Sequence, residues 1–122
     1  MYAFQNRKVI SEFESLSLRY VNSGTIDDAY PIPNCDELLY DVTNANFITS
    51  LDCTSGYWQI PVRQNDIYKT AFVTNNGHYE WLVMPFGLKT AGNTFQRVMD
   101  DILRPHQQFA KAYIDDTAAY SK

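Results

Sequence analysis

The sequence predicts an α+β fold with a mainly antiparallel sheet and helices on one face. Two observations support this class. Short segments rich in Tyr, Phe and β-branched residues alternate with turn signals, as in strands that are joined by hairpins. Other segments carry a helix cap or the i, i+3, i+4 apolar spacing of an amphipathic helix. The expected order of elements is helix, strand, hairpin, helix, hairpin.

A short helix is expected from Cys35 to about Val42. The preceding Tyr30-Pro31-Ile32-Pro33 should be extended, because a residue before proline avoids the helical region. Asn34 can cap the helix, and acidic residues in the first turn suit its positive end. A strand should follow over Phe47 to Asp52, and after a break the chain should resume an extended run over Tyr57 to Val62.

The rest of the chain predicts two hairpins with a helix between them. Asn75-Asn76-Gly77 is a strong hairpin signal between the strand patterns 69–74 and 78–83. The amphipathic spacing predicts a helix from about Thr90 to Leu103, which a following Arg-Pro ends. The last element is a hairpin over 109–120.

Length and composition indicate one domain or one piece of a larger domain. The 122 residues are 45% hydrophobic and 20% charged, which excludes disordered and membrane-spanning classes. Cys35 and Cys53 are too few for a disulfide framework, and no Cys/His spacing indicates a zinc site, so a reducing intracellular compartment is expected. The net charge of −4 argues against the basic face that proteins gripping nucleic acid usually show.

Three aspartate pairs occur, and their surroundings differ. Asp27-Asp28 lies in a polar loop, and Asp100-Asp101 is expected on the solvated face of the second helix. Asp115-Asp116 lies between apolar or small residues, in a setting like that of Asp52, and one sheet edge has room for all three acids. Such carboxylates are costly without a positive partner, and a divalent metal would supply one. On spacing alone, a metal site and a simple Asp-rich turn remain equally good interpretations.

Six segments of the sequence follow one another in a specific order: Tyr30–Pro33, Leu51–Ile60, Lys69–Phe72, Gly77–Leu88, Thr94–Arg97 and Tyr113–Asp116. Together they resemble the reverse transcriptase of gypsy-type LTR retrotransposons. The resemblance covers roughly residues 19–122, and it implies a right-hand polymerase fold with most of the palm, a ferredoxin-like antiparallel sheet, and part of the fingers. Residues 1–18 match poorly and are expected to be an irregular segment with a weak helical pattern from Val9 to Leu18. Thumb, connection and RNase H segments are expected to be absent.

The resemblance implies catalytic and metal-binding roles for the acids. Asp52 is similar to the aspartate of the first catalytic motif, and Asp115 and Asp116 to the acidic pair of the Tyr-x-Asp-Asp motif. Together they would hold two Mg²⁺ ions, with Mn²⁺ as an alternative, and the backbone carbonyl of Cys53 would add a ligand. One ion would activate the primer 3′-hydroxyl and the other would stabilise the leaving pyrophosphate.

The resemblance also implies contacts with nucleotide and primer. Tyr57 resembles the aromatic residue that clashes with a 2′-hydroxyl and so selects deoxynucleotides, although spacing alone favours a core aromatic. Phe86 and Gly87 resemble the turn of the nucleotide pocket, and Tyr113 would pack near the primer terminus. The implied partners are a primed RNA or DNA template, deoxynucleoside triphosphates and the rest of a polyprotein, in the cytoplasm, in a virus-like particle or in the nucleus.

Two functions stay open for the chain itself. The first is an RNA-directed DNA polymerase domain from a retrotransposon polyprotein, which the intact acids favour. The alternative is a decayed, catalytically inactive palm remnant that acts at most as an interaction module. The light return strand Thr117 to Tyr120, Gly92 in place of the family's proline, and the acidic charge favour the alternative. An unrelated Mg²⁺-dependent phosphohydrolase would need only the acids and would leave the other segments unexplained.

Overall fold

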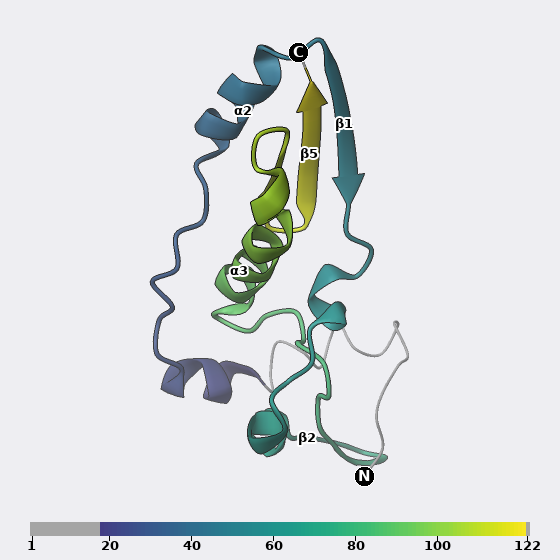
Figure 1. The fold of residues 1–122 in the computed structure, drawn as a ribbon. Coiled ribbons are helices and arrows are strands. Elements are labelled where there is room, and N and C mark those ends of the chain that lie inside the picture. Colours follow the sequence, from purple (N-terminus) through teal and green to yellow (C-terminus); the bar gives the residue numbers. More distant parts are fainter. Residues whose placement is uncertain (1–17, 122) are drawn as a thin grey trace. The chain divides into compact units, whose positions relative to one another are not determined.

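The computed structural model of the chain describes residues 18–121 (Figure 1). These residues belong to two compact units, one made of the chain up to Asp27 with Tyr57–Ala91, the other of Asp28–Gly56 with the chain from Gly92 onward. The predictions of an irregular segment over 1–18 and of a helix from Val9 lie outside the described residues, apart from Leu18. Leu18 itself is buried and lies in a helical stretch that the structure describes over 18–24.

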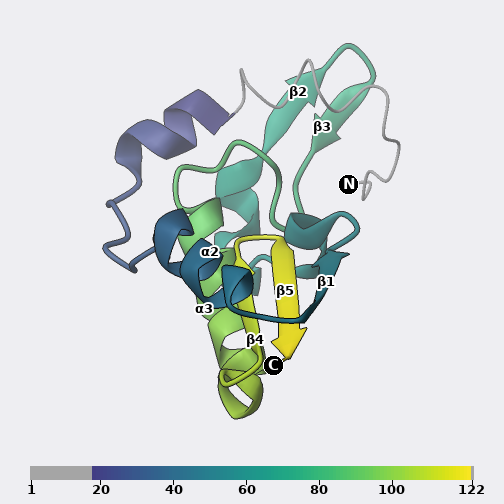
Figure 2. The same cartoon turned by 90° about the horizontal axis from the view of Figure 1, so that it is seen from above.

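The second unit contains an antiparallel sheet of three strands in the order β1-β5-β4. Figure 1 shows β1 and β5 side by side, and Figure 2 shows all three strands. The predicted strand and the predicted last hairpin are both confirmed, and β5 is the central strand, paired on both sides. The bounds are β1 Phe47–Asp52, β4 Ala110–Tyr113 and β5 Asp116–Ser121.

Helix α3, Ala91–Leu103, packs against this sheet and runs beside β4 (Figure 2). Phe95 and Met99 are buried one turn apart, as the predicted amphipathic face requires. Ala110 and Ala112 on β4 are buried too, and such small side chains let a helix approach a strand closely. The helix predicted over 90–103 is therefore confirmed, and it passes into a 3₁₀ turn, η3 (Arg104–His106), that contains the proline.

Helix α2, Cys35–Thr43, forms as its cap predicts, because the Asn34 side-chain oxygen accepts a hydrogen bond from the Asp36 N–H at 3.0 Å. In the part of the chain that the structure describes, α2 has no fully buried residue. It is linked to β4 by an ion pair between Asp41 and Lys111. The helix thus combines an ion pair to the sheet with apolar residues that are at most half-buried.

The first unit contains the predicted Asn75-Asn76-Gly77 hairpin, but its strands are shorter than expected. They are β2 (Phe72–Thr74) and β3 (Gly77–Tyr79), which pair with Thr74 opposite Gly77. Residues 69 and 70 instead end a 3₁₀ helix, η2 (Gln64–Thr70). The Thr70 hydroxyl accepts the Trp81 N–H at 2.8 Å, so a side chain supplies the partner that a longer strand would have supplied.

The extended run predicted over Tyr57 to Val62 is wrong for Tyr57–Gln59 but correct around Pro61, where the Val62 N–H donates to the Leu82 carbonyl and the Ile60 carbonyl accepts the Met84 N–H. Residues Gly56–Gln59 form a 3₁₀ turn, η1, and the Ile60 N–H donates to the Tyr57 carbonyl at 3.1 Å. Only Pro61 takes part in a bridge, with Val83. The short apolar run fits a strand or a turn equally well, and local backbone hydrogen bonds decide for the turn.

Two of the acids predicted on solvated surfaces, Asp28 and Asp100, are half-buried and have specific partners. The Asp28 carboxylate accepts from the Tyr30 N–H and from Arg97, and these contacts, the Tyr30 hydrogen bond first, lower the pKa of Asp28. Asp100 accepts from the Tyr30 hydroxyl at 2.7 Å and from the Gln96 amide at 2.8 Å. Asp28 and Asp100 are therefore half-buried and paired rather than fully solvated, because neither a polar loop nor apolar periodicity reveals a polar partner far along the chain.

Two expectations from composition can be compared with the structure. Cys35 and Cys53 are both free, as their number and spacing predict. Within residues 18–121, no helix has the length and apolar character needed to cross a bilayer.

Gly56 gives a stability test of the junction after β1. A Cβ added there would lie 2.8 Å from Cζ of the buried Phe95 ring and 3.4 Å from the Cβ of Cys53. We expect Gly56→Ala to lower the free energy of unfolding by about 1–3 kcal/mol, because the ring must shift in a packed site. The measurement is the urea midpoint at unchanged m-value.

The matched control for Gly56→Ala is Gly24→Ala. In the described part of the chain no atom lies within 4 Å of a Cβ built at Gly24. The control should therefore leave the midpoint unchanged or raise it slightly. Equal midpoints for the two variants would show that Gly56 is not tightly packed.

Candidate functional site

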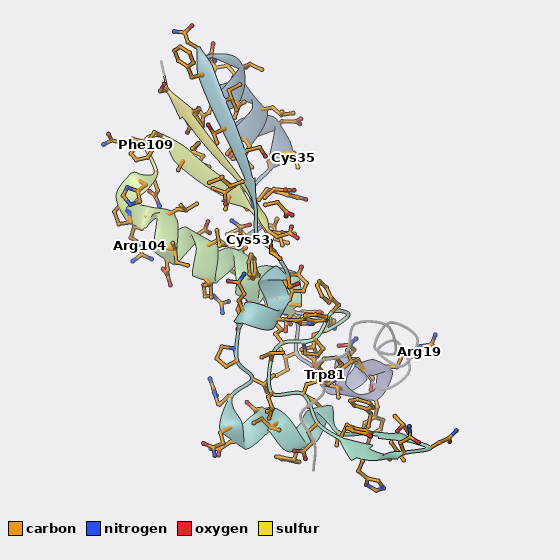
Figure 3. All side chains as sticks on the ribbon, turned by 90° about the vertical axis from the view of Figure 1, so that its right-hand side faces the viewer. Arg19, Cys35, Cys53, Trp81, Arg104 and Phe109 are labelled. Carbon is orange, nitrogen blue, oxygen red and sulfur yellow. The ribbon has the colours of Figure 1, made fainter. Side chains whose placement is uncertain are left out.

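The sheet brings the three predicted acids to one edge. The register of β1 against β5 sets Asp52 directly opposite Asp116, and Asp115 occupies the turn before β5. The Cys53 N–H donates to the Asp115 carbonyl at 3.0 Å, which ties the end of β1 to the turn. Figure 3 shows Cys53 where β1 ends. The expectation that Asp52 and the Asp115-Asp116 pair share one edge of a single sheet is confirmed.

The turn that carries Asp115 is strained. Its central residues are Ile114 and Asp115, between the paired Tyr113 and Asp116. Ile114 has φ 54°, a left-handed conformation that is unfavourable for a β-branched side chain, with a cost of about 1–3 kcal/mol. Tight hairpins favour a positive φ at this place because it matches the twist of the strands.

The prediction that both acids sit at the turn is correct for Asp115 and wrong for Asp116. Asp116 is the first residue of β5 and pairs with Tyr113 on one side and Asp52 on the other. The two neighbouring carboxylates therefore come from different backbone environments, one from a turn and one from a strand.

The charges at this edge are uncompensated in the described chain. None of the ion pairs within residues 18–121 involves the carboxylate of Asp52, Asp115 or Asp116. Burial, followed by the nearby carboxylates of these three residues, raises the pKa of the Cys53 thiol. The three carboxylates thus lie close enough to act on the same thiol. Carboxylates gathered in this way favour a cation beside them.

The carboxylates of the three acids do not converge on one point in this structure. Within residues 18–121, no three His, Cys, Asp or Glu side chains are gathered as a ready metal site. The backbone carbonyl of Cys53 accepts the Gly56 N–H at 3.1 Å, which uses one of its two lone pairs. The candidate ligand atoms are carboxylate and carbonyl oxygens, which Mg²⁺ prefers. The chemistry of these residues therefore fits that ion.

The residues predicted to contact the nucleotide lie in the other unit, which holds Tyr57, Phe86 and Gly87. The Tyr57 and Phe86 rings have centroids 5.2 Å apart, and Trp58 contacts Phe86 edge-on at 5.5 Å. Tyr57 is half-buried and Phe86 is 40% exposed, so this cluster is partly packed and partly open to solvent.

Gly87 has φ +89°, which favours glycine at this turn. Asn22 holds the turn from both sides: its Nδ2 donates to the Gly87 carbonyl and its Oδ1 accepts the Lys89 N–H, each at 2.8 Å. No role at this turn was predicted for Asn22, because a polar residue carries no local signal of a partner 65 residues further along the chain.

Tyr113, predicted near the primer terminus, is half-buried on β4. Hydrogen bonding with the Cys35 thiol raises the pKa of Tyr113. Lys111 lies two residues before it on the same strand, where the ion pair with Asp41 of α2 raises the pKa of the Lys111 amine. Both side chains are fixed from α2.

The unit that holds Tyr113 and the three acids also contains a cavity of about 560 Å³ between α2, α3 and β4. None of the residues predicted to bind metal, nucleotide or primer lines it. The cavity wall carries both signs of charge and is formed by Tyr30, Pro33, Glu37, Leu38, Asp100, Leu103, Arg104, Gln107, Ala110, Lys111 and Ala112.

The light return strand predicted to weaken the acidic turn is the centre of the sheet. Its backbone pairs with β1 along six residues and with β4 along four, so two hydrogen-bonded ladders support it. Thr117 on this strand is 7% exposed. Support for the turn thus comes from backbone pairing rather than from large side chains.

A comparison with known proteins shows which family and which curated proteins the chain is similar to. A family model described as reverse transcriptase (RNA-dependent DNA polymerase) matches residues 6–122. The Pol polyprotein from transposon opus of Drosophila melanogaster is 47% identical over 108 residues, which are 88% of this chain and 11% of that polyprotein. The enzymatic polyprotein of Cauliflower mosaic virus (strain NY8153) is 40% identical over 116 residues, 95% of this chain and 16% of that polyprotein.

The predicted resemblance to gypsy elements is confirmed by one of these relatives. The Pol polyprotein from transposon gypsy of Drosophila melanogaster is 39% identical over 120 residues, which are 96% of this chain and 11% of the polyprotein. The chain therefore spans between about a tenth and a sixth of the length of these curated relatives.

Solved structures share the fold. A foamy viral protease-reverse transcriptase in complex with double-stranded DNA matches with a TM-score of 0.77 at 19% identity, over 87% of this chain and 19% of that one. The same type of protein in complex with an RNA/DNA hybrid matches with a TM-score of 0.76 at 19% identity, over 86% of this chain and 14% of that one. The predicted α+β palm and fingers fold is thereby confirmed.

Thr117 offers a test of the packing under the acidic edge. Its Oγ1 is buried, and among the described residues it has no hydrogen-bond partner. We expect Thr117→Val to raise the free energy of unfolding by about 1 kcal/mol, because valine has the same shape without the unsatisfied hydroxyl. Thr49→Val, at an exposed position of β1, is the control and should change little. Destabilisation by Thr117→Val in thermal unfolding would mean that the hydroxyl has a partner.

Proposed function

Because the chain belongs to the reverse transcriptase (RNA-dependent DNA polymerase) family, we propose that it forms the metal-binding core of an RNA-directed DNA polymerase. The proposed reaction is template-directed deoxynucleotidyl transfer by a two-Mg²⁺ mechanism, carried out within a retroelement polyprotein. The observation that carries this proposal is the register that sets Asp52 opposite Asp116, with Asp115 in the adjoining turn.

Asp52, Asp115 and Asp116 are the proposed metal ligands. They come from a strand end, a turn and a strand start. Asp52 and Asp116 are paired with each other, and the Cys53 N–H ties the Asp115 carbonyl to the end of β1. The second lone pair of the Cys53 carbonyl would complete the oxygen set. Bound Mg²⁺ supplies activation of the primer 3′-hydroxyl and stabilisation of the leaving pyrophosphate.

The nucleotide contacts are proposed for the other unit. Tyr57 would exclude a 2′-hydroxyl, with Phe86 packed against its ring, and Gly87 would let the backbone approach the nucleotide closely. Tyr113 would pack at the primer terminus. A primed RNA or DNA template is the proposed partner. The net charge of −4 indicates that other parts of the polyprotein supply most of the phosphate contacts.

A catalytically inactive remnant is the second candidate. Its support is that no ready metal site is gathered among residues 18–121 and that the chain is acidic. The two candidates differ in metal binding at the acidic edge, which can be measured without catalysis.

Metal binding tests the acids directly. Titrating the ¹⁵N-labelled chain with Mn²⁺ should broaden the amide signals of residues 52, 53, 115 and 116 first. Asp115→Asn should weaken the binding about tenfold or more, because it removes one charge from the ligand set. Asp101→Asn is the control, since Asp101 is exposed and paired with Arg104. Broadening that is uniform, or equal in both variants, would exclude the assigned site.

Primer extension completes this test. A primed RNA template, deoxynucleotides and Mg²⁺ are supplied to the chain alone and to the chain joined to a thumb segment. Extension that is lost in Asp115→Asn supports the polymerase. Extension that survives Asp115→Asn contradicts the metal role, and Mn²⁺ binding without extension in either form supports the inactive remnant.

Tyr57 is tested by the choice between nucleotides. We expect Tyr57→Val in the active form to raise ribonucleotide use relative to deoxynucleotide use by about tenfold or more, because the smaller side chain removes a clash. Tyr68→Val, at an exposed tyrosine in the same unit, is the matched control. An unchanged kcat/KM ratio would identify Tyr57 as a packing residue beneath Phe86.

A further inference from the structure

Gln96 is a polar side chain completely removed from solvent, with 0% exposure, on the face of α3 that meets the sheet. A buried amide is costly unless its donors and acceptor are satisfied. Gln96 makes three hydrogen bonds with the described residues, and two of them go to the backbone of the hairpin that carries the acids.

Both backbone contacts flank Tyr113. The Gln96 Oε1 accepts the Ile114 N–H at 2.7 Å, and its Nε2 donates to the Ala112 carbonyl at 3.1 Å. Ile114 is the residue with φ 54°, so the amide supplies a partner to the strained position of the turn. A backbone N–H at such a place that lacked a partner would favour a different turn.

Asp100 fixes the orientation of the Gln96 amide. Its Oδ1 accepts from the Gln96 Nε2 at 2.8 Å, which directs the amide nitrogen to Asp100 and leaves the oxygen for Ile114. Its Oδ2 accepts from the Tyr30 hydroxyl at 2.7 Å, and the Arg97 guanidinium lies 4.8 Å from the Tyr30 ring centroid. The network therefore runs from the extended Tyr30 segment through α3 to the acidic turn.

We propose that Gln96, oriented by Asp100, is a positioning residue that holds the Ile114-Asp115 turn in the conformation that presents Asp115 for metal binding. The part concerning metal rests on the proposed function, whereas the part concerning the turn stands on the hydrogen bonds alone. Gln96 contacts neither metal nor substrate in this role, because it acts through the backbone of Ile114 and Ala112.

The test measures the turn and the metal site separately in the full chain. Gln96→Met keeps the length of the side chain and removes its hydrogen bonds. Exchange of the Ile114 amide with solvent should become about tenfold faster, because one hydrogen bond of ordinary strength is lost. Mn²⁺ broadening of the Asp115 and Asp116 amides should need about fivefold more metal or greater. Gln107→Met, at an exposed glutamine, is the matched control.

Asp100 variants keep the proposal testable if Gln96→Met does not fold. Asp100→Leu leaves Gln96 in place but removes its outer acceptor, so it should change both readouts in the same direction by a smaller factor. Asp100→Asn retains an acceptor oxygen for Gln96 and should restore wild-type values. A purely structural role would lower global stability while leaving Ile114 exchange and metal affinity at wild-type levels.

The outcomes separate the two proposals. Faster Ile114 exchange together with weaker Mn²⁺ binding supports the positioning role. Unchanged Ile114 exchange, or faster exchange with unchanged Mn²⁺ binding, overturns it. If the wild-type chain binds no Mn²⁺, the proposed metal function fails, and the exchange measurement still decides whether Gln96 holds the turn.

Discussion

The pairing of β1 with β5 is the interaction on which the candidate site depends. Side chains alternate between the two faces of a strand, so a slip of one residue would move every side chain of β1 to the other face. The register keeps Asp52 opposite Asp116, and the Cys53 N–H extends the link to the Asp115 carbonyl. Because β5 pairs with β4 as well, this register is held from both sides, even though β5 carries small side chains.

The acidic turn contains a strained backbone conformation and a hydrogen bond that stabilises it. Ile114 adopts a left-handed φ that its branched side chain disfavours, and the buried Gln96 amide accepts its N–H. Asp100 and Tyr30 then fix the amide from behind. A polar network of this kind specifies one arrangement when all its members are satisfied, and it loses that value when one is removed. The position of Asp115 is therefore determined by a helix and a loop as well as by its own hairpin.

The chain belongs to the reverse transcriptase family, and the proposed metal ligands lie at the end of β1 and in and after the turn between β4 and β5. The turn at Gly87 has its own support, because Asn22 bonds the Gly87 carbonyl and the Lys89 N–H around a glycine with positive φ. The chain spans about a tenth to a sixth of the curated polyproteins that it matches, and its net charge is −4.

The sequence by itself determined what depends on neighbouring residues. The Asn34 cap, the strand Phe47–Asp52, the Asn75-Asn76-Gly77 hairpin and the amphipathic α3 were all predicted, because caps, turns and periodicity are local signals. The ordered segments identified the family and the three acids. The first half of the strand-like run after Asp52 was mispredicted, because residues 56–59 satisfy their hydrogen bonds locally in a 3₁₀ turn, whereas the second half pairs around Pro61 and Val83.

Only the tertiary structure decided what depends on distant partners. It made β5 the central strand and brought Asp52 to Asp116 across 64 residues of sequence. It also gave Asp28 and Asp100 specific partners and buried Gln96 behind the turn. The physical reason is that a polar side chain has the same local sequence pattern whether it meets water or a backbone amide far along the chain, and only packing distinguishes the two.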